Sequence, residues 1–203
     1  MREKADEARE SARAAGAEGG GGRRRLRAAA AAAAALILVA SAGLSYVPCR
    51  VEGDSMSPTL DGGSSQRRGD VILLNRIAYL AGGPRRWDVV VIRRREGSFE
   101  DGVRDTVKRI VGLPGEEIEI ADGRCFAGGR PLEPPPALAG RPVVGKGPYG
   151  RGRVRLGGDE YFVLGDSSYV SRDSRSFGPV RRGEIRGRVD WIVFPLSRAG
   201  RVR

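Results

Sequence analysis

From residue 70 onward, glycine and proline divide this chain into short runs rich in valine and isoleucine, a pattern that few fold classes accommodate. Runs of this length, bounded by turn residues, are typical of β-strands. We expect strands at residues 70–75, 87–93, 103–112, 116–121, 160–165 and 187–194. The sequence therefore predicts a mostly β protein, in which residues 121–158, with the proline-rich stretch PLEPPPALAG, form a small or irregular insertion.

The N-terminal quarter of the chain has a different composition. Residues 1–27 are rich in charge, alanine and glycine and end in a cluster of arginines, which indicates a disordered basic tail. They precede 22 uncharged residues, Ala28–Cys49, enough for one crossing of a bilayer, which takes roughly 20. We expect a transmembrane anchor at 28–48, with the arginines holding the tail in the cytoplasm and residues 49–203 forming an extracytoplasmic domain. A cleavable signal sequence, with ASA at 40–42 as the cleavage site, and a soluble alanine-rich helix are the alternatives.

The residue composition excludes several kinds of catalytic site. The chain contains no histidine, so Ser-His-Asp sites, Cys-His sites and histidine-containing metal sites are impossible. Its two cysteines, Cys49 and Cys125, form no Cys-x-x-Cys pair and are too few for a disulfide framework. They could bridge, but we expect separate thiols. A serine nucleophile in this chain therefore needs a base other than histidine.

Lysine usage points to such a base. Of 36 basic residues only Lys4, Lys108 and Lys146 are lysines, and the others are arginines, which stay protonated in proteins. Lys108 lies among valine and isoleucine in DTVKRIVGLPGE, on an expected strand. We expect burial there to lower the pKa of the Lys108 amine and so let it accept a proton. The alternative is a lysine on an edge strand whose ammonium group reaches solvent.

Five blocks carry a resemblance to a known family. They are GDSMSPTL (53–60), GDVILL (69–74), WDVVVIR (87–93), VKRIVGLPGE (107–116) and GDSSYVSRDSRSFGPV (165–180). In sequence and in order these blocks resemble bacterial type I signal peptidases over most of the chain from Val51 to Val193. The resemblance implies a catalytic core of coiled antiparallel β-sheets in a membrane-anchored serine endopeptidase. Such an enzyme removes N-terminal signal peptides from secreted preproteins after small residues, at Ala-X-Ala sites, through an acyl-enzyme.

The resemblance also implies a serine–lysine dyad. Ser55 would attack the scissile carbonyl, and neutral Lys108 would accept the serine proton and return it to the leaving amine. The backbone N–H of Ser55 is the expected oxyanion donor. Some members of the family carry a serine two positions before the nucleophile as a second donor, and this chain has Gly53 there. The identity of the second donor is therefore left open.

Residues of the last block match supporting positions in the family. Ser171 matches a serine that hydrogen-bonds and orients the catalytic lysine. Asp166 matches an acid near the active site, which we expect to pair with Arg109. Asp173 and Arg175 match an ion pair that holds the scaffold. The resemblance implies no metal ion and no cofactor.

An extended peptide is the expected substrate. It would add as a strand to the edges near residues 51–53 and 105–107. The resemblance places four apolar side chains around shallow pockets for the small residues before the cut, and these are Val51, Met56, Leu60 and Val107. The same four positions suit ordinary core packing equally well, and the sequence does not separate the two interpretations.

The charge of the chain bears on its partners. The formal net charge is +11, and residues 50–203 alone hold 28 basic and 20 acidic residues. We attribute the excess to attraction toward anionic lipid headgroups, since the sequence has neither the basic–aromatic cluster of an RNA-binding module nor a helix-turn-helix pattern. The expected partners are secretory preproteins and the lipid bilayer, with no nucleic acid, and we expect a monomer in the bacterial cell membrane. Two other classes stay open: a related serine–lysine processing peptidase, either conjugation-linked or a self-cleaving repressor, and a non-catalytic membrane-anchored β module.

Overall fold

A computed structural model of the protein describes residues 27, 45–64, 67–95 and 102–202. The chain divides into two units, Met1–Leu44 and Ser45–Arg203. The predicted tail at 1–27 lies outside the described residues except for Arg27, and so does most of the predicted anchor at 28–48. In the described part of the chain, no helix is long and apolar enough to span a membrane.

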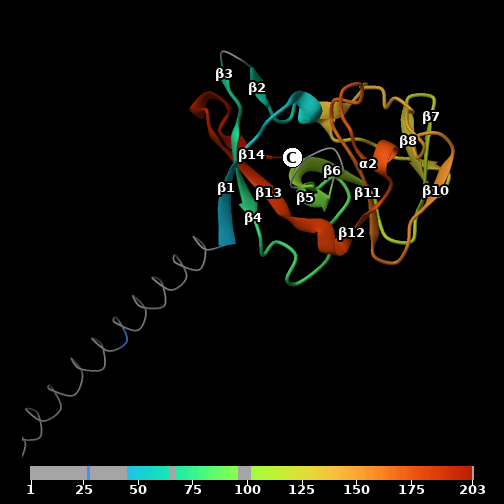
Figure 1. The fold of residues 1–203 in the computed structure, drawn as a ribbon, viewed down its shortest axis with the longest axis horizontal. Helices are drawn as coiled ribbons and strands as arrows, with labels where there is room; N and C mark the ends of the chain where they lie inside the picture. The colour runs from blue at the N-terminus through green and yellow to red at the C-terminus, as the bar shows by residue number, and fades with distance from the viewer. Residues whose placement is uncertain (1–26, 28–44, 65–66, 96–101, 203) are drawn as a thin grey trace, which may run out of the picture. The chain divides into compact units, whose positions relative to one another are not determined.

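The second unit is built around an antiparallel sheet of eight strands (Figure 1). Seven strands follow one another across the sheet, and β14 pairs with β13 in addition. In sheet order the seven are β1 (Tyr46–Arg50), β4 (Val71–Asn75), β13 (Ile185–Phe194), β5 (Val89–Arg95), β6 (Val103–Gly112), β11 (Glu160–Leu164) and β12 (Val180–Arg181), and β14 is Gly200–Arg201. Every pairing between them is antiparallel, which confirms the predicted mostly β class.

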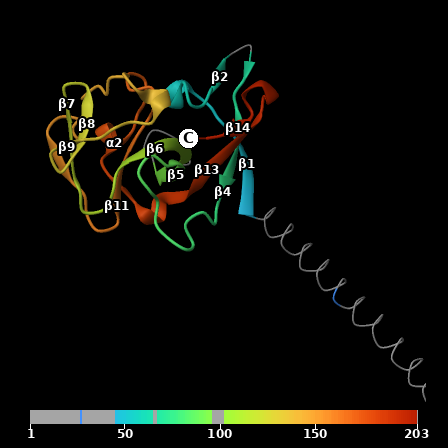
Figure 2. The same cartoon turned by 180° about the vertical axis from the view of Figure 1, so that it is seen from behind.

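Four strands form a second antiparallel sheet, on the side of this unit away from β1 and β4 (Figure 2). In sheet order they are β10 (Arg153–Arg155), β7 (Glu117–Ala121), β8 (Arg124–Ala127) and β9 (Arg130–Pro131). Asp122 and Gly123 connect β7 to β8 with φ angles of 48° and 73°, the left-handed conformation that a tight two-residue hairpin requires. The predicted insertion at 121–158 is therefore partly regular, because hairpin turns order it into a small sheet.

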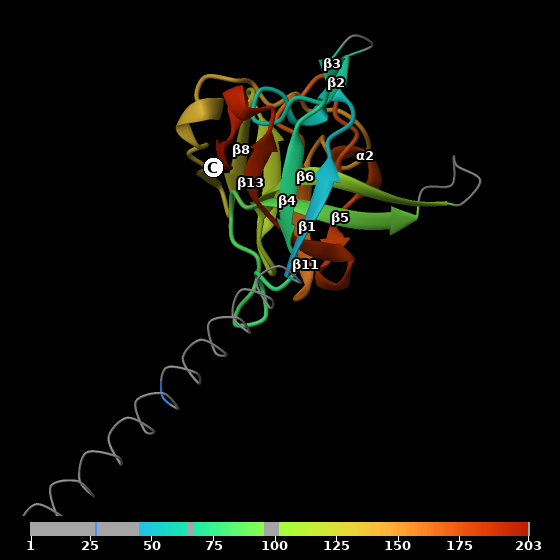
Figure 3. The ribbon, with the colours of Figure 1, turned by 90° about the vertical axis from the view of Figure 1, so that its left-hand side faces the viewer.

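Short elements connect the strands. The 3-10 helix η1 (Asp54–Met56) precedes a small hairpin of β2 (Gly63–Ser64) and β3 (Arg67–Arg68). Later connections contain η2 (Pro136–Leu138), α2 (Ser174–Phe177), η3 (Arg182–Glu184) and η4 (Leu196–Arg198). β5 and β6 continue beyond the rest of the sheet as a two-stranded ribbon (Figure 3).

Each of the six runs predicted to be a strand overlaps one, namely β4, β5, β6, β7, β11 or β13. The sequence pattern missed β1, because residues 46–48 have the composition of the end of an apolar span. In the structure the Tyr46 hydroxyl donates to Asp190 Oδ2 at 2.9 Å, and Val47 packs against the core. The folded unit therefore begins before residue 49, the boundary that the sequence suggested.

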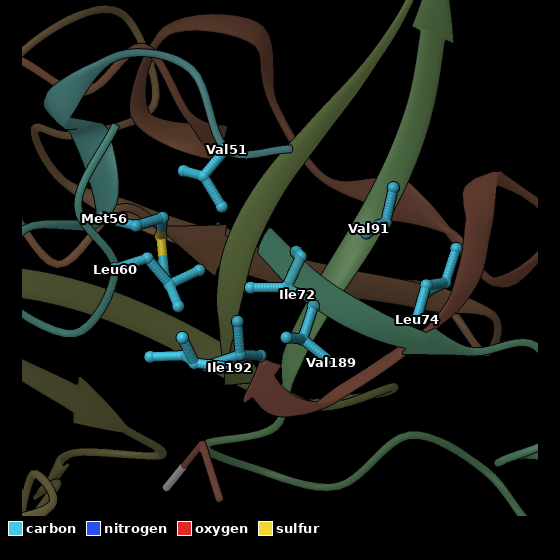
Figure 4. Packing of buried hydrophobic residues seen from close by; sticks show 9 residues of the cluster. Val51, Met56, Leu60, Ile72, Leu74, Val91, Val189 and Ile192 are labelled. Atoms are coloured by element: carbon cyan, nitrogen blue, oxygen red, sulfur yellow. The ribbon is translucent and has the colours of Figure 1, made fainter. Parts of the chain in front are cut away.

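The core lies on both faces of β5. Successive side chains of a strand point to opposite faces, so Val89 and Val91 enter one apolar cluster while Val90 and Ile92 enter another. The first cluster combines side chains from β4, β5 and β13 with side chains of the loop that follows β1 (Figure 4). Its buried members are Val51, Met56, Leu60, Ile72, Leu74, Val89, Val91, Val189 and Ile192. Packing of this cluster positions the loop, which also carries Ser55.

Candidate active site

The loop that follows β1, residues 51–61, is called the serine loop below, and it carries Ser55 in the single turn of η1. The Leu60 N–H donates to Met56 O at 2.9 Å and the Ser57 N–H donates to Asp54 O at 3.1 Å, so the chain turns back on itself after the serine. Met56 and Leu60, with exposed fractions of 1% and 0%, anchor this turn in the first apolar cluster (Figure 4). Ser55 itself is only half-buried.

Three of the four predicted substrate contacts lie in the core. Val51, Met56 and Leu60 are all buried in the first apolar cluster rather than open to a peptide. This burial favours core packing, the second of the two interpretations that the sequence allowed, because these side chains close the space between loop and sheet. Val107 is only partly buried and packs against the margin of the same cluster.

Gly53 stands directly before η1 with φ 73° and ψ 159°. This region of conformational space is essentially restricted to glycine. Space is not the restriction, since a Cβ atom added to Gly53 would meet no atom within 4 Å. The backbone conformation therefore favours glycine at this position.

Lys108 lies on β6, opposite Val90 of β5, and only 3% of its surface is exposed. Its Nζ donates to Ser55 Oγ at 3.0 Å, although the serine comes 53 residues earlier in the chain. The same amine donates to Val107 O at 2.8 Å. The serine and the lysine that the sequence singled out are therefore within hydrogen-bonding distance, as a nucleophile and its base must be.

The hydrogen bond expected between Ser171 and the lysine is not formed in this structure. Ser171 is 1% exposed, and its Oγ has no hydrogen-bond partner among the described residues. The side chain nevertheless lies beside the serine loop, because a Cβ atom added to Gly165 would be 2.2 Å from Ser171 Oγ and 2.4 Å from Ser55 O. Val107 O holds the Lys108 amine instead. A side-chain pattern gives no indication of a backbone partner of this kind.

Arg109 follows Lys108 on β6, and its side chain is fully buried. Its Nε and Nη2 each lie 2.8 Å from a carboxylate oxygen of Asp166, so the expected ion pair is present. The guanidinium also donates to Trp87 O at 2.9 Å and to Thr59 Oγ1 at 3.1 Å. Arg109 therefore connects the lysine strand to the block at 165–180 and to the serine loop.

The expected ion pair of Asp173 and Arg175 is present and completely buried. Arg175 Nε lies 2.7 Å from Asp173 Oδ1, and Arg175 Nη1 donates to Val144 O at 2.8 Å and to Ser168 Oγ at 2.5 Å. Asp173 Oδ2 also accepts the Gly165 N–H at 3.0 Å. This network fixes the turn that places Gly165 and Ser171 against the serine loop.

Thr59 is a site residue that sequence reasoning did not single out. It lies inside the quoted block GDSMSPTL, but its side-chain partner, Arg109, follows 50 residues later. No local pattern in one sequence connects the two positions. The fold brings them together because β6 passes beside the serine loop.

Two strand edges near Ser55 are unpaired in the described part of the chain. Residues 103–108 of β6 pair with β5 alone, and β1 pairs with β4 alone. The two edges lie close to each other, because Val107 packs against the cluster that contains Val51. The pKa of the Cys49 thiol on β1 is raised, mainly by burial and further by the charge of Asp105 on β6. The second effect agrees with the closeness of the two strands.

A cavity of about 440 Å³ is bounded by residues of both sheets. Its lining includes Trp87, Arg109 and Asp166, and includes neither Ser55 nor Lys108. Since a bound peptide must reach the serine and the lysine, the unpaired strand edges fit a peptide substrate and this cavity does not.

The two cysteines are free thiols. Burial raises the pKa of Cys125 to about 12. A thiol is nucleophilic only as the thiolate, so Cys125 does not compete with Ser55 for the role of nucleophile.

Comparison with known proteins identifies the family of this chain. A family model described as signal peptidase, peptidase S26, matches residues 24–194. Signal peptidase I of Bacillus caldolyticus is 32% identical over 158 residues, which cover 72% of this chain and 79% of that protein. Signal peptidase I P of Bacillus subtilis subsp. natto is 30% identical over 159 residues, which cover 75% of this chain and 78% of that protein. A crystal structure of a signal peptidase I from Enterococcus faecalis V583 covers 52% of this chain and 95% of that chain, with 25% identity and a TM-score of 0.42. By the family model and these relatives, the chain belongs to the signal peptidase family, peptidase S26.

Proposed function

We propose that this protein, a signal peptidase of family S26, uses Ser55 as its nucleophile and Lys108 as its general base. The observation that carries the proposal is the 3.0 Å separation of Ser55 Oγ and Lys108 Nζ in a chain without histidine. Family membership supplies the reaction, which is hydrolysis of the bond between the signal peptide and the mature part of a secreted preprotein. The geometry supports Ser55 and Lys108 as the residues that perform it.

In the acylation step, neutral Lys108 accepts the hydroxyl proton of Ser55 while Ser55 Oγ attacks the scissile carbonyl. The resulting ammonium group donates this proton to the leaving amine, and the signal peptide remains as an ester on Ser55. In the second step Lys108 accepts a proton from water while the resulting hydroxide attacks the ester. The ammonium group then returns the proton to Ser55 Oγ as the signal peptide leaves with its new carboxylate, which restores the free serine and the neutral lysine. The Val107 carbonyl supports both steps, because it holds the amine beside the serine at 2.8 Å. Burial of Lys108 disfavours the charged form that cannot act as a base.

The backbone N–H of Ser55 is the proposed oxyanion donor. The Ser55 carbonyl accepts the Ser167 N–H at 3.0 Å, which restrains the peptide unit that follows the serine. Gly53 has no side chain to offer as a second donor, and its backbone conformation disfavours a residue that has one. Oxyanion stabilisation in this enzyme therefore depends on backbone groups.

We propose that the substrate binds as an extended strand between the unpaired edges of β1 and β6. Backbone hydrogen bonds to both edges would hold the peptide beside Ser55. Met56 and Leu60 fill the core below these edges, so a pocket formed there is shallow. Shallow pockets beside the partly buried Val107, above the buried Val51, would accept alanine and reject larger side chains, as the expected cleavage at Ala-X-Ala sites requires.

We further propose that the protein is a monomer held in the bacterial cell membrane by one helix within residues 28–44, with its basic tail in the cytoplasm. The expected span at 28–48 is shortened, because Tyr46–Arg50 form β1. Cationic residues directly before the span and an uncharged span of sufficient length support this topology. A protease added to spheroplasts should digest the peptidase domain and spare residues 1–22. Protection of the Ser55 domain in sealed, correctly oriented membranes would contradict the topology.

Incubation of the detergent-solubilised protein with a secretory precursor tests the catalytic proposal. The wild type should release the mature chain with one new N-terminus after an Ala-X-Ala site, as determined by mass spectrometry. Ser55→Ala and Lys108→Ala should each lower turnover by roughly 10³-fold or more, because each removes one half of a proton-transfer pair. Lys108→Arg should be equally inactive, since arginine keeps the charge and cannot be deprotonated.

Two nearby residues of the same types provide matched controls. Ser57→Ala removes the other serine of the loop, and Lys146→Ala removes another lysine of the folded unit. Both variants should keep wild-type turnover. Turnover near the wild-type rate in Ser55→Ala or in Lys108→Ala would contradict the proposed dyad.

A further inference from the structure

Arg198 reaches the serine loop from η4, far from the loop in sequence. Its Nη2 donates to Thr59 O at 3.2 Å and to Pro58 O at 3.4 Å. Its Nε and Nη2 also lie 2.9 Å and 3.0 Å from the two carboxylate oxygens of Asp70. One guanidinium therefore binds two backbone carbonyls of the loop and a carboxylate at the same time.

Asp70 hydrogen-bonds to both ends of the serine loop and so joins them. Its Oδ2 accepts the Asp61 N–H at 2.9 Å, and its own N–H donates to Asp61 O at 2.8 Å. Its carbonyl accepts the Val51 N–H at 2.8 Å. The Asp70 side chain is 1% exposed, and a buried carboxylate needs a partner of opposite charge, which Arg198 supplies.

The backbone at the base of the loop is packed too closely to shift without cost. A Cβ atom added to Gly62 would lie 2.1 Å from Gly53 O, and one added to Gly69 would lie 2.2 Å from Val51 O. Backbone therefore lies directly against backbone next to Asp61 and next to Asp70, where the two ends of the loop meet. The loop is rigid at its base, and the contacts of Pro58 and Thr59 add to the burial of Met56 and Leu60 in holding its far part.

Thr59 is held by two arginines from different parts of the chain. Its Oγ1 accepts from Arg109 Nη2 at 3.1 Å, and its carbonyl accepts from Arg198 Nη2 at 3.2 Å. Arg109 is the neighbour of Lys108 on β6, so the first contact fixes the position of the loop relative to the strand that carries the lysine. The second contact fixes the position of the loop relative to Asp70 at the loop base. Thr59 follows Ser55 by four residues through the hydrogen-bonded turn of the loop, and a shift of Thr59 therefore moves the serine.

We propose that Arg198 is a positioning residue for Ser55, which sets the distance from Ser55 Oγ to Lys108 Nζ by holding the Pro58 and Thr59 carbonyls against Asp70. Arg198 touches none of the reacting atoms in this role. We expect lysine to replace it poorly, because the three donors of an ammonium group diverge from one nitrogen, whereas the planar guanidinium presents Nε and Nη2 side by side to the two carboxylate oxygens. The inference rests on the proposed function, since it requires Ser55 to be the nucleophile.

Steady-state kinetics of the full chain on a peptide with an Ala-X-Ala site test the inference through Arg198→Ala and Arg198→Lys. Both variants should lose kcat by roughly tenfold to a hundredfold, because a misplacement of about 1 Å can cost about 100-fold in rate. KM should stay within about twofold of the wild type, since the strand edges that bind the peptide are unchanged. Arg198→Lys keeps a positive charge beside Asp70 and so retains the fold if the alanine variant is unstable.

Chemical rescue separates positioning from a general loss of stability. The Arg198 side chain is 35% exposed, so a free guanidinium ion can enter the space that Arg198→Ala leaves. Guanidinium chloride, at a concentration below that which unfolds the variant, should restore part of its kcat at a temperature where it is fully folded. Sodium chloride at the same ionic strength should restore none, and neither salt should raise the kcat of the wild type.

Arg153→Ala is the matched control, because Arg153 is an arginine with two carboxylate partners on the small sheet, away from the loop. Its kcat and KM should equal those of the wild type. Wild-type kcat in folded Arg198→Ala or Arg198→Lys, a change confined to KM, or a kcat loss in Arg198→Ala that guanidinium does not restore would each overturn the inference. Failure of the proposed function would give a different result, namely turnover near the wild-type rate in Ser55→Ala or in Lys108→Ala.

Discussion

The eight-stranded sheet and the four-stranded sheet of the folded unit are each stabilised by a different kind of polar contact. In and around the eight-stranded sheet, buried polar contacts join segments that are far apart in the sequence. Lys108 contacts Ser55 across 53 residues, and Arg109 contacts Asp166 across 57 residues. These contacts all converge on the serine loop and on β6.

In the four-stranded sheet, by contrast, β7, β8 and β9 are joined by hairpin turns. Its ion pairs join Arg153 to Glu117 and Glu119 at the surface, where water screens them. The buried ion pairs of the first region, Arg109 with Asp166 and Asp173 with Arg175, cannot be separated without leaving a buried charge, whereas the exposed pairs of the second region can. We therefore expect sensitivity to substitution to follow the buried contacts and not the amount of regular structure.

The largest loss of stability should follow removal of Arg175. Arg175→Ala leaves the Asp173 carboxylate buried without its partner, which costs about 3–5 kcal/mol of unfolding free energy. Urea denaturation of the wild type and the variant measures this difference. A loss below about 1 kcal/mol would place this pair among the exposed ones and remove the distinction between the two regions.

Gly165→Ala should affect activity more than stability. The added Cβ atom would lie 2.2 Å from Ser171 Oγ and 2.4 Å from Ser55 O, so the backbone of the serine must move. We expect overpacking to cost about 1–3 kcal/mol of stability. The displaced serine should lower kcat by roughly 100-fold.

Gly158→Ala is the control for this substitution, because a Cβ atom there meets no atom within 4 Å and the residue has no positive φ. Its kcat and unfolding free energy should match the wild type. Equal kcat values for Gly165→Ala and Gly158→Ala would contradict the close approach of Gly165 to the nucleophile.

A smaller effect is expected at Gly53. Gly53→Ser forces a side chain onto a backbone with φ 73° and ψ 159°, which costs about 1–3 kcal/mol. Thermal and urea unfolding measure the cost, and peptide cleavage measures the rate. An increase in kcat would mean that a side-chain donor reaches the oxyanion from this position, contrary to the backbone-only arrangement proposed here.

The smallest effect should come from the four-stranded sheet. Arg153 is 65% exposed at its side chain, and exposed ion pairs contribute about 0–1 kcal/mol. Arg153→Ala should therefore change the unfolding free energy by less than about 1 kcal/mol and leave cleavage unchanged. A loss as large as that of Arg175→Ala would show that the two regions are coupled more strongly than their contacts indicate.

Local patterns in the sequence were sufficient for most of the large sheet. Alternating or continuous valine and isoleucine runs predicted β4, β5, β6, β11 and β13, because strand formation is signalled by neighbouring residues. In that sheet they missed β1, whose residues continue an uncharged segment without a break, and the two-residue strands β12 and β14. In these strands the partner strand, and not the strand's own composition, makes the segment extended.

The candidate site divides in the same way. Ser55, Lys108 and the pair of Arg109 with Asp166 were predicted, because family blocks and the scarcity of lysine mark them. The contacts of Thr59 and Arg198 were not, since each depends on a donor and an acceptor brought together by the fold. The expected bond from Ser171 to the lysine is replaced by a backbone carbonyl, which no side-chain pattern reveals.

The pH dependence of cleavage tests the central claim, proton transfer by Lys108, most directly. Lys146 is the relevant control, because burial and then the charge of Arg175 lower its pKa, so its titration could imitate that of a catalytic lysine. We would measure kcat/KM for the wild type and Lys146→Arg from about pH 3 to about pH 10, a range that contains carboxylate and lysine titration but no histidine titration in this chain. We predict that kcat/KM of both proteins rises on the alkaline side of neutrality with the same midpoint, because only neutral Lys108 accepts the proton of Ser55. A shift or loss of the alkaline rise in kcat/KM in Lys146→Arg would contradict proton transfer by Lys108. An optimum near pH 4 to 5, roughly where carboxylates titrate, would contradict it as well.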